Sequence, residues 1–166
     1  MLTKIALTLL ALLLLLLTVV ALVGGRLGWW QGQPPADLGV KDGRLKPPSK
    51  SPNSVSSQAL LYPDHPVQRA AMIAPLALAG DAAATLAKLA QVIAVWPGAQ
   101  VVTQQPGYLY ARFGTRLLGF VDDAEFWADP AAGVIQVRSA SRLGRKDFEV
   151  NRQRIEALRS ALAAAR

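Results

Sequence analysis

The sequence predicts an α+β fold: a four-stranded antiparallel sheet with two helices packed on one face, behind an N-terminal transmembrane helix. Three observations predict it: an uncharged apolar run near the N-terminus, two segments with helical periodicity, and four strand-like runs between them. A chain of 166 residues allows one domain plus an appendage. We therefore divide it into a short tail (1–4), a membrane-spanning segment (5–25), a Pro- and Gly-rich linker or strap (26–52) and a soluble α+β domain (53–166).

The apolar run extends from Ile5 to Gly25 and contains no charged residue. About 20 apolar residues wound as a helix match the hydrocarbon thickness of a bilayer. A cleaved signal peptide is the alternative, since Ala21-Leu-Val resembles a poor cleavage site. However, the apolar core of such a peptide usually has only about 7–15 residues. We expect a single, retained membrane span.

The flanks of this span bear on its orientation. Lys4 precedes the span, whereas Arg26 and several further basic residues follow it. A positive-inside count would therefore keep the C-terminal domain in the cytoplasm. A very short tail before one long span instead behaves as an uncleaved export signal, and Trp29 and Trp30 suit the headgroup level. We expect a single-pass protein of the cell inner membrane with a periplasmic C-terminal domain.

Composition excludes several classes of function. The net charge is +7, yet no aromatic stacking motif accompanies the arginines, so we expect no nucleic-acid partner. An anionic membrane surface accounts for a basic, anchored protein. The chain has no cysteine, which excludes disulfides, thiolate metal sites and cysteine nucleophiles.

Two helices are expected to frame the domain. Asp81 is a suitable N-cap for the first, which reaches about Val95 before Pro97-Gly98 ends it. The second runs from about Phe148 to Ala164, with Asp147 as its cap. Short turn-like breaks separate the four strand-like runs between them, which are Ala99–Thr103, Tyr108–Gly114, Leu118–Trp127 and Gly133–Ser139.

Side-chain alternation assigns the charged residues of these strands to faces. Arg112, Asp123, Glu125 and Arg138 fall on the face away from the helices. There they would form a cross-strand charge ladder on an open face, worth roughly 0.2–1 kcal/mol per pair. We interpret this ladder as structural.

Asp122 falls on the apolar face, where an unpaired carboxylate would be costly. Its candidate partners are Ser139, Ser141, Arg142 and the first turn of the last helix, where Asn151 points inward. These five residues could form an internal network that fixes the helix on the sheet. They could equally form a pocket for a small anionic or polar ligand, using Arg142 and the helix N-terminus.

His65 is the only histidine and heads a second, weaker set of site candidates. As a general base it could act with Asp122 or Asp123 in a hydrolase, with Arg142 holding an anionic substrate. No nucleophile-elbow or phosphate-loop sequence accompanies it, and a single histidine without cysteine argues against zinc, so we expect no metal and no cofactor. The other members of this weaker set are Asp123, Glu125, Arg138, Asp147 and Arg152.

Several motifs resemble one known family. The chain reads Ser51-Pro-Asn-Ser-Val-Ser-Ser-Gln, then His65 and Pro75, then Gly119-Phe-Val-Asp-Asp-Ala-Glu-Phe, Val137-Arg-Ser-Ala-Ser-Arg-Leu-Gly, Asp147 and Asn151-Arg-Gln-Arg-Ile-Glu. This pattern is similar to the domain of unknown function 1499 (DUF1499) family, from about Leu38 to Leu162. The resemblance implies a bacterial or plastid protein, often placed behind a membrane segment, without an established activity.

The chain departs from that family pattern at two places. Relatives often carry a cysteine shortly before the Pro-Asn-x-Val-Ser-Ser motif and another within it, where this chain has Ser49 and Ser54. The resemblance implies that such a pair forms a structural bridge, which suits an oxidising compartment. Relatives also tend to have glycine where this chain has Glu149, which places a larger charged residue at the entrance of any pocket.

Three hypotheses for function follow. The first is a non-enzymatic, membrane-tethered domain of the cell envelope that binds a small anionic ligand or an envelope protein. The second is the hydrolase that uses His65. The third is a structural assembly factor, which predicts a large exposed apolar patch in place of a pocket.

Overall fold

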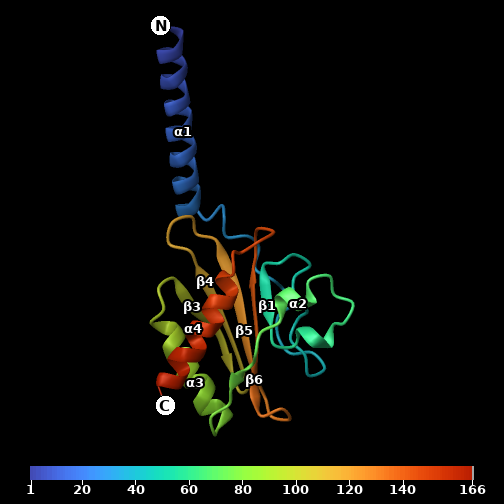
Figure 1. The fold of residues 1–166 in the computed structure, drawn as a ribbon. Coiled ribbons are helices and arrows are strands. Elements are labelled where there is room, and N and C mark those ends of the chain that lie inside the picture. The colour runs from blue at the N-terminus through green and yellow to red at the C-terminus, as the bar shows by residue number, and fades with distance from the viewer. Residues whose placement is uncertain (166) are drawn as a thin grey trace.

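The computed structural model describes residues 1–165. Its elements, coloured along the chain in Figure 1, are α1 (Leu2–Arg26), β1 (Ser54–Ser56), η1 (Ala59–Leu61), α2 (Gln68–Ala71), β2 (Leu76–Ala77), α3 (Ala82–Ala94), β3 (Ala99–Gln105), β4 (Tyr108–Gly114), β5 (Val121–Asp129), β6 (Val134–Ser141) and α4 (Val150–Ala164). The α+β class and the antiparallel sheet are confirmed.

The sheet has six strands, so the expectation of four is wrong in number. β3 to β6 form the predicted meander, in the order β6-β5-β4-β3, and every pairing is antiparallel. β1 and β2 both pair with the free edge of β6. They have only 3 and 2 residues, and all three residues of β1 are buried, so no alternating pattern identifies them.

Both predicted helices are present, with one difference at a boundary. The Asp81 carboxylate accepts from the backbone N–H of Ala84 at 2.7 Å and caps α3 as expected. α4 begins at Val150, two residues later than expected, because Phe148 and Glu149 have φ of 52° and 66°. The N-cap residue is Glu149 and not Asp147 as expected, but Asp147 still contacts the first turn, since its Oδ2 accepts from Asn151 N at 3.0 Å.

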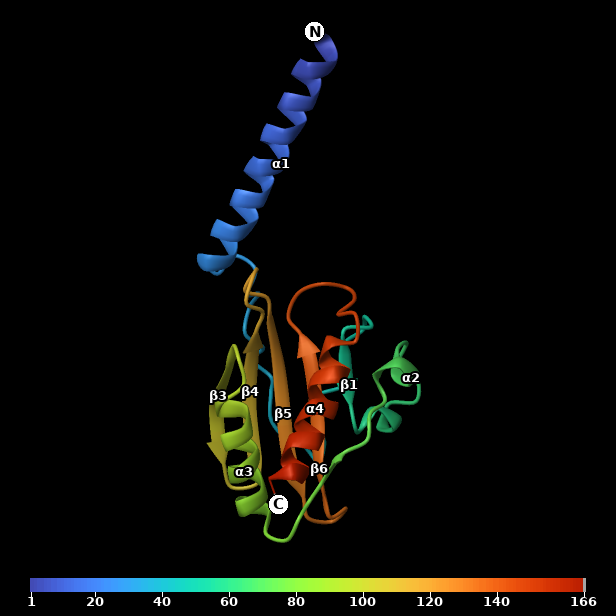
Figure 2. The ribbon, with the colours of Figure 1, turned by 60° about the vertical axis from the view of Figure 1, so that its left-hand side comes forward.

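α3 and α4 lie side by side on one face of the sheet (Figure 2), and the hydrophobic core lies between these helices and the sheet. Alternate residues of the central strands point into it, among them Leu109, Phe126 and Ile135, each fully buried. α4 contributes Ile155 and Leu158 at one-turn spacing. This packing fixes which strand residues face the helices and which face away.

The opposite face of the sheet is covered as well. We call residues 31–50 the strap; they run along this face, turn back at the Lys41–Arg44 bridge and return. Gly39 N donates to Glu125 Oε1 at 2.7 Å, and Arg138 Nε donates to Pro47 O at 3.0 Å. Glu125 and Arg138 are therefore 0% and 4% exposed, and the expected open face is wrong.

α1 projects from one end of the domain (Figure 1), and no residue of its most apolar stretch is buried. It is long and apolar enough to cross a membrane, a property that a secretion signal near the N-terminus would share. At about 1.5 Å per residue the helix exceeds the roughly 30 Å of hydrocarbon it would have to cross.

Candidate functional site

Two polar clusters lie back to back on the two faces of β5. Asp122 and Asp123 are successive residues of one strand, so their side chains point to opposite faces. Asp122 lies under α4, whereas Asp123 lies under the strap. We describe these as the helix-face cluster and the strap-face cluster.

The helix-face cluster centres on a buried ion pair. Arg154 Nη2 lies 2.5 Å from Asp122 Oδ2, and the two side chains are 8% and 7% exposed. The same guanidinium donates from Nη1 to Asn151 Oδ1 at 2.8 Å and lies 4.7 Å from the centre of the Phe113 ring. The Asp122 carboxylate thus has a cation beside it, as its burial requires.

Asn151 connects this pair to the start of α4. Its Oδ1 also accepts from Ser139 Oγ at 2.5 Å, and its Nδ2 donates to Ser141 Oγ at 3.0 Å and to Asp147 Oδ2 at 2.8 Å. A further bond of 3.1 Å joins Nδ2 to the carbonyl of Asn53, ahead of β1. Because these polar groups are satisfied within the fold, the cluster has the character of an internal framework.

Four of the five residues of the expected cluster therefore lie together on the helix face, namely Asp122, Ser139, Ser141 and Asn151. Arg142 does not, because it lies on the strap face with Asp123. The cation that sequence reasoning missed is Arg154. Its spacing of three residues from Asn151 places both on one side of a helix and was the signal that could have found it.

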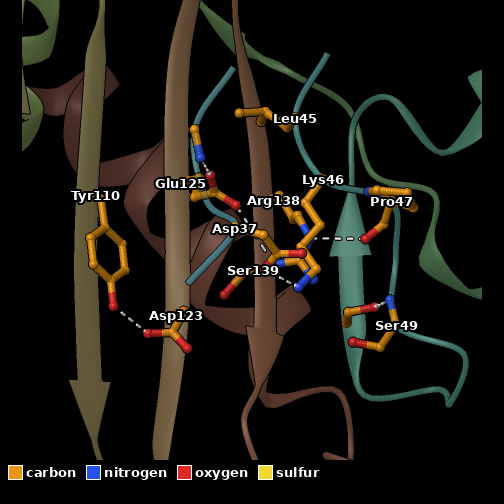
Figure 3. Close-up of polar contacts among 12 residues, drawn as sticks. Asp37, Leu45, Lys46, Pro47, Ser49, Tyr110, Asp123, Glu125, Arg138 and Ser139 are labelled. Atoms are coloured by element: carbon orange, nitrogen blue, oxygen red, sulfur yellow. Dashed lines mark hydrogen bonds and ion pairs between the residues drawn. The ribbon is translucent and has the colours of Figure 1, made fainter. Parts of the chain in front are cut away.

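On the strap face, Arg138 and Glu125 form the central pair (Figure 3). Arg138 Nη1 lies 3.7 Å from Glu125 Oε2, and Glu125 Oε1 accepts from Gly39 N and from the Tyr108 hydroxyl, the latter at 2.8 Å. Burial raises the pKa of Glu125 and lowers the pKa of Arg138. Burial thus disfavours the charged form of each side chain.

Arg142 and Asp123 form a closer pair beside it. Arg142 donates from Nε and Nη2 to the two carboxylate oxygens at 2.9 and 2.8 Å, and the Tyr110 hydroxyl donates to Asp123 Oδ1 at 2.6 Å. The hydrogen bonds to Asp123 raise the pKa of Arg142, and burial raises the pKa of Tyr110 to about 12. Arg112 lies opposite Asp123 in register but is exposed, so the ladder lacks this expected member.

A pocket of about 540 Å³ lies between the strap and the sheet at these pairs. Lys46 is paired with Asp37 at 2.5 Å, whereas Lys50 is exposed and has no ion pair within residues 1–165. The Nδ1 of His65 is buried and without a hydrogen-bond partner in the described chain. The ionisable lining residues are Lys46, Lys50, His65, Asp123, Arg138 and Arg142.

Basic side chains therefore dominate this pocket, with a single carboxylate that already binds Arg142. A hollow of similar size, about 510 Å³, lies farther along the strap, but no charged residue lines it. The pocket at His65 thus combines a cavity with an excess of basic side chains in its lining.

The remaining candidates lie elsewhere. Asp147 is bound to the start of α4, and Arg152 donates to the carbonyl oxygens of Ala70 and Met72 at 2.8 and 2.7 Å. Both hold segments of the fold together. Among residues 1–165, no group of three or more His, Asp or Glu side chains converges as a metal site would require.

Ser49 and Ser54, the positions at which relatives often carry cysteines, are neighbours in the fold: Ser49 N donates to Ser54 Oγ at 2.8 Å (Figure 3).

Comparison with known proteins identifies the family of the chain. Searches of curated proteins and of solved structures gave no significant match. The profile described as "Protein of unknown function (DUF1499)" matches residues 44–162, which include all six strands of the sheet, the ion pairs of both clusters and α4 up to Leu162. The chain therefore belongs to the DUF1499 family.

Proposed function

We propose that this protein is a single-pass protein of the inner membrane whose periplasmic domain binds a small anionic ligand in the strap pocket, without converting it. The observation that carries this proposal is the lining of the pocket: four basic side chains and a histidine against one carboxylate. The retained α1 helix supplies the anchor.

The free donors of the pocket suit an oxyanion. Arg138 uses only Nε in a hydrogen bond, and its pairing with Glu125 is long at 3.7 Å, so Nη1 and Nη2 remain for a ligand. Lys50 adds an exposed charge to the lining, and the His65 ring is part of the same lining. A planar guanidinium binds a carboxylate or phosphate through two parallel hydrogen bonds.

The size of the pocket limits the ligand to a small molecule. Ligand pockets of about 300–1,000 Å³ hold small organic molecules, and the observed 540 Å³ falls within this range. Proline residues of the strap form one wall, and they restrict its conformation. The binding site is thereby formed before the ligand arrives, which reduces the entropy cost of binding.

His65 makes the test direct, because the chain contains one histidine and its imidazole signals in NMR need no assignment. Full-length protein in detergent micelles, labelled at histidine, would be titrated with inorganic phosphate and with citrate. We expect saturable shifts of the His65 signals with at least one of these anions. Their absence with both would remove the support for an anion site.

Matched variants separate pocket binding from general charge effects. Lys50→Gln removes a charge from the pocket lining, whereas Arg112→Gln removes an exposed charge on β4 that does not line the pocket. We expect Lys50→Gln to weaken the apparent affinity severalfold and Arg112→Gln to leave it unchanged. Equal weakening by both variants would mean that the anions bind the basic surface without using the pocket.

A hydrolase is the second candidate, and one observation favours it: His65 and Asp123 line the same pocket. Asp122 has no part in it, since that side chain lies on the helix face. Asp123 is held by Arg142 and Tyr110, so it is not available to orient the imidazole. Turnover of p-nitrophenyl phosphate or p-nitrophenyl acetate that His65→Gln abolishes would favour this candidate.

A further inference from the structure

Apolar side chains gather on two loops at the end of the domain from which α1 emerges. We call these the apical loops: residues 115–120 between β4 and β5, and residues 142–149 between β6 and α4. Figures 1 and 2 show both loops level with the C-terminal end of α1. The turn between β5 and β6 lies at the opposite end of the sheet.

Close backbone contacts hold this arrangement together. Gly25 is so near the first apical loop that a Cβ there would lie 2.8 Å from the carbonyl oxygen of Leu118. A Cβ on Gly32 would lie 2.8 Å from the Cβ of Arg142, in the second loop. The end of α1 and the chain that follows it thus rest on both apical loops.

The apical loops expose large apolar side chains to an unusual extent. Phe148 is 85% exposed, Leu117 69% and Leu143 41%. Between the two loops lies a mainly apolar hollow of about 350 Å³, with Phe120 and Val150 in its lining. A cluster of exposed apolar groups of this kind marks an interaction surface, since isolated exposed residues are ordinary but contiguous ones are not.

Basic residues accompany these apolar side chains. Arg116, Arg145 and Lys146 are all exposed in the apical loops. The acidic neighbours are engaged elsewhere: Asp147 accepts from Asn151, and Glu149 pairs with Arg152 at 2.8 Å. Apolar tips flanked by basic residues match the chemistry of an anionic bilayer surface, whose headgroups are negative and whose interior is apolar.

Two tryptophans mark the level of the bilayer interface. Trp29, three residues after the end of α1, is 59% exposed, and Trp30 Nε1 donates to the carbonyl of Ala21 at 3.0 Å. Tryptophan concentrates at membrane–water interfaces because its ring is apolar and its N–H is polar. The apical loops contact this same segment of chain and therefore reach the same level.

We propose that the apical loops lie in the headgroup region of the membrane that α1 crosses. Phe148, Leu117 and Leu143 enter the outer edge of the hydrocarbon, and the three basic residues contact anionic phospholipid headgroups. This inference rests on the retained anchor of the proposed function and is independent of the anion pocket. It makes the domain a second point of membrane attachment, held in a fixed orientation.

The absence of cysteine allows a direct test by single-cysteine spin labelling of the full chain. Labels would be placed at Phe148→Cys, at Leu13→Cys within α1, and at Ala132→Cys in the distal turn. Each protein would be reconstituted into nanodiscs of phosphatidylcholine mixed with phosphatidylglycerol. Accessibility to oxygen, which concentrates in the bilayer, would be compared with accessibility to a water-soluble nickel chelate.

We expect oxygen to dominate at positions 13 and 148 and the nickel chelate to dominate at position 132. If position 13 reports bilayer and position 148 reports water, the membrane contact is refuted while the anchor stands. If both report water, the anchor and the contact fail together. Shielding of position 148 from both reagents would indicate a protein partner or a second copy in place of lipid, and would also refute the proposal.

A separate experiment tests the contribution of the basic residues of the apical loops. Combining Arg116→Gln, Arg145→Gln and Lys146→Gln with the label at position 148 should shift its accessibility toward the nickel chelate. The unaltered loops should show the same shift in nanodiscs of phosphatidylcholine alone, because attraction to anionic lipid is then lost. A preference for oxygen that ignores both changes would refute the role assigned to the basic residues.

Discussion

Substitution of Arg154 by methionine tests whether the helix-face cluster is a structural framework. Methionine keeps the length and apolar contact of the arginine stem but removes the cation that lies 2.5 Å from Asp122. The substitution also removes the donor to Asn151 and the contact with the Phe113 ring. Both members of the ion pair are more than nine-tenths buried, so Asp122 would be left as an uncompensated charge.

The expected loss in the free energy of unfolding is about 3–5 kcal/mol, the usual consequence of removing one partner from a buried pair. The individual hydrogen bonds and the cation–π contact do not add to this figure, because they share one guanidinium. For a domain of ordinary stability, about 5–15 kcal/mol, the loss would be a large fraction of the total.

The measurement is urea unfolding of the full chain in detergent micelles, followed by near-ultraviolet circular dichroism. Arg112→Met is the matched control, since Arg112 is exposed on a neighbouring strand, and it should change stability by no more than about 0.5 kcal/mol. Adding Asp122→Asn to Arg154→Met should recover part of the loss, because an amide needs no counter-ion. A loss below about 1 kcal/mol for Arg154→Met, or no recovery in the double variant, would refute this account.

Two further predictions concern backbone strain and pH. Glu149→Gly should raise the free energy of unfolding by about 0.5–1 kcal/mol, because Glu149 has φ of 66° and glycine adopts this conformation without steric cost; a loss of stability in the same urea assay would contradict this. Burial raises the pKa of Glu125 above its ordinary value of 4.5, so the unfolded chain releases this proton first and Glu125 lowers stability as pH rises. The stability of Glu125→Gln relative to the unaltered protein should therefore increase from about pH 4 to 7, and a flat or falling difference would count against the assignment.

Long, regular elements were predictable because their patterns are local. The periodicity of α3 and α4, the Asp81 cap and the alternation along β4, β5 and β6 follow from each segment alone. The start of α4 could be predicted only in part from the sequence. Asp147 indicated the approximate start, but the positive φ of Phe148 and Glu149 moves the N-cap to Glu149 and could not be predicted from side chains that normally avoid this conformation.

The partners of the buried charges were less predictable, because alternation places a side chain on a face without saying what covers that face. Asp122 was correctly placed among apolar residues, and Ser139, Ser141 and Asn151 do lie near it. Arg142 was assigned to the wrong face, although alternation continued one residue beyond β6 places it on the side of Arg138, opposite Ser139 and Ser141.

The sequence by itself determined the α+β class, an apolar N-terminal helix of membrane-spanning length, and the family, since each depends on composition or local pattern. Only the tertiary structure decided that a proline-rich segment covers the second face and encloses a basic pocket beside His65. It also brought two separate loops to the end of α1. The physical reason is the same in both cases: irregular segments have no periodicity, and contacts across long stretches of chain fix where they lie.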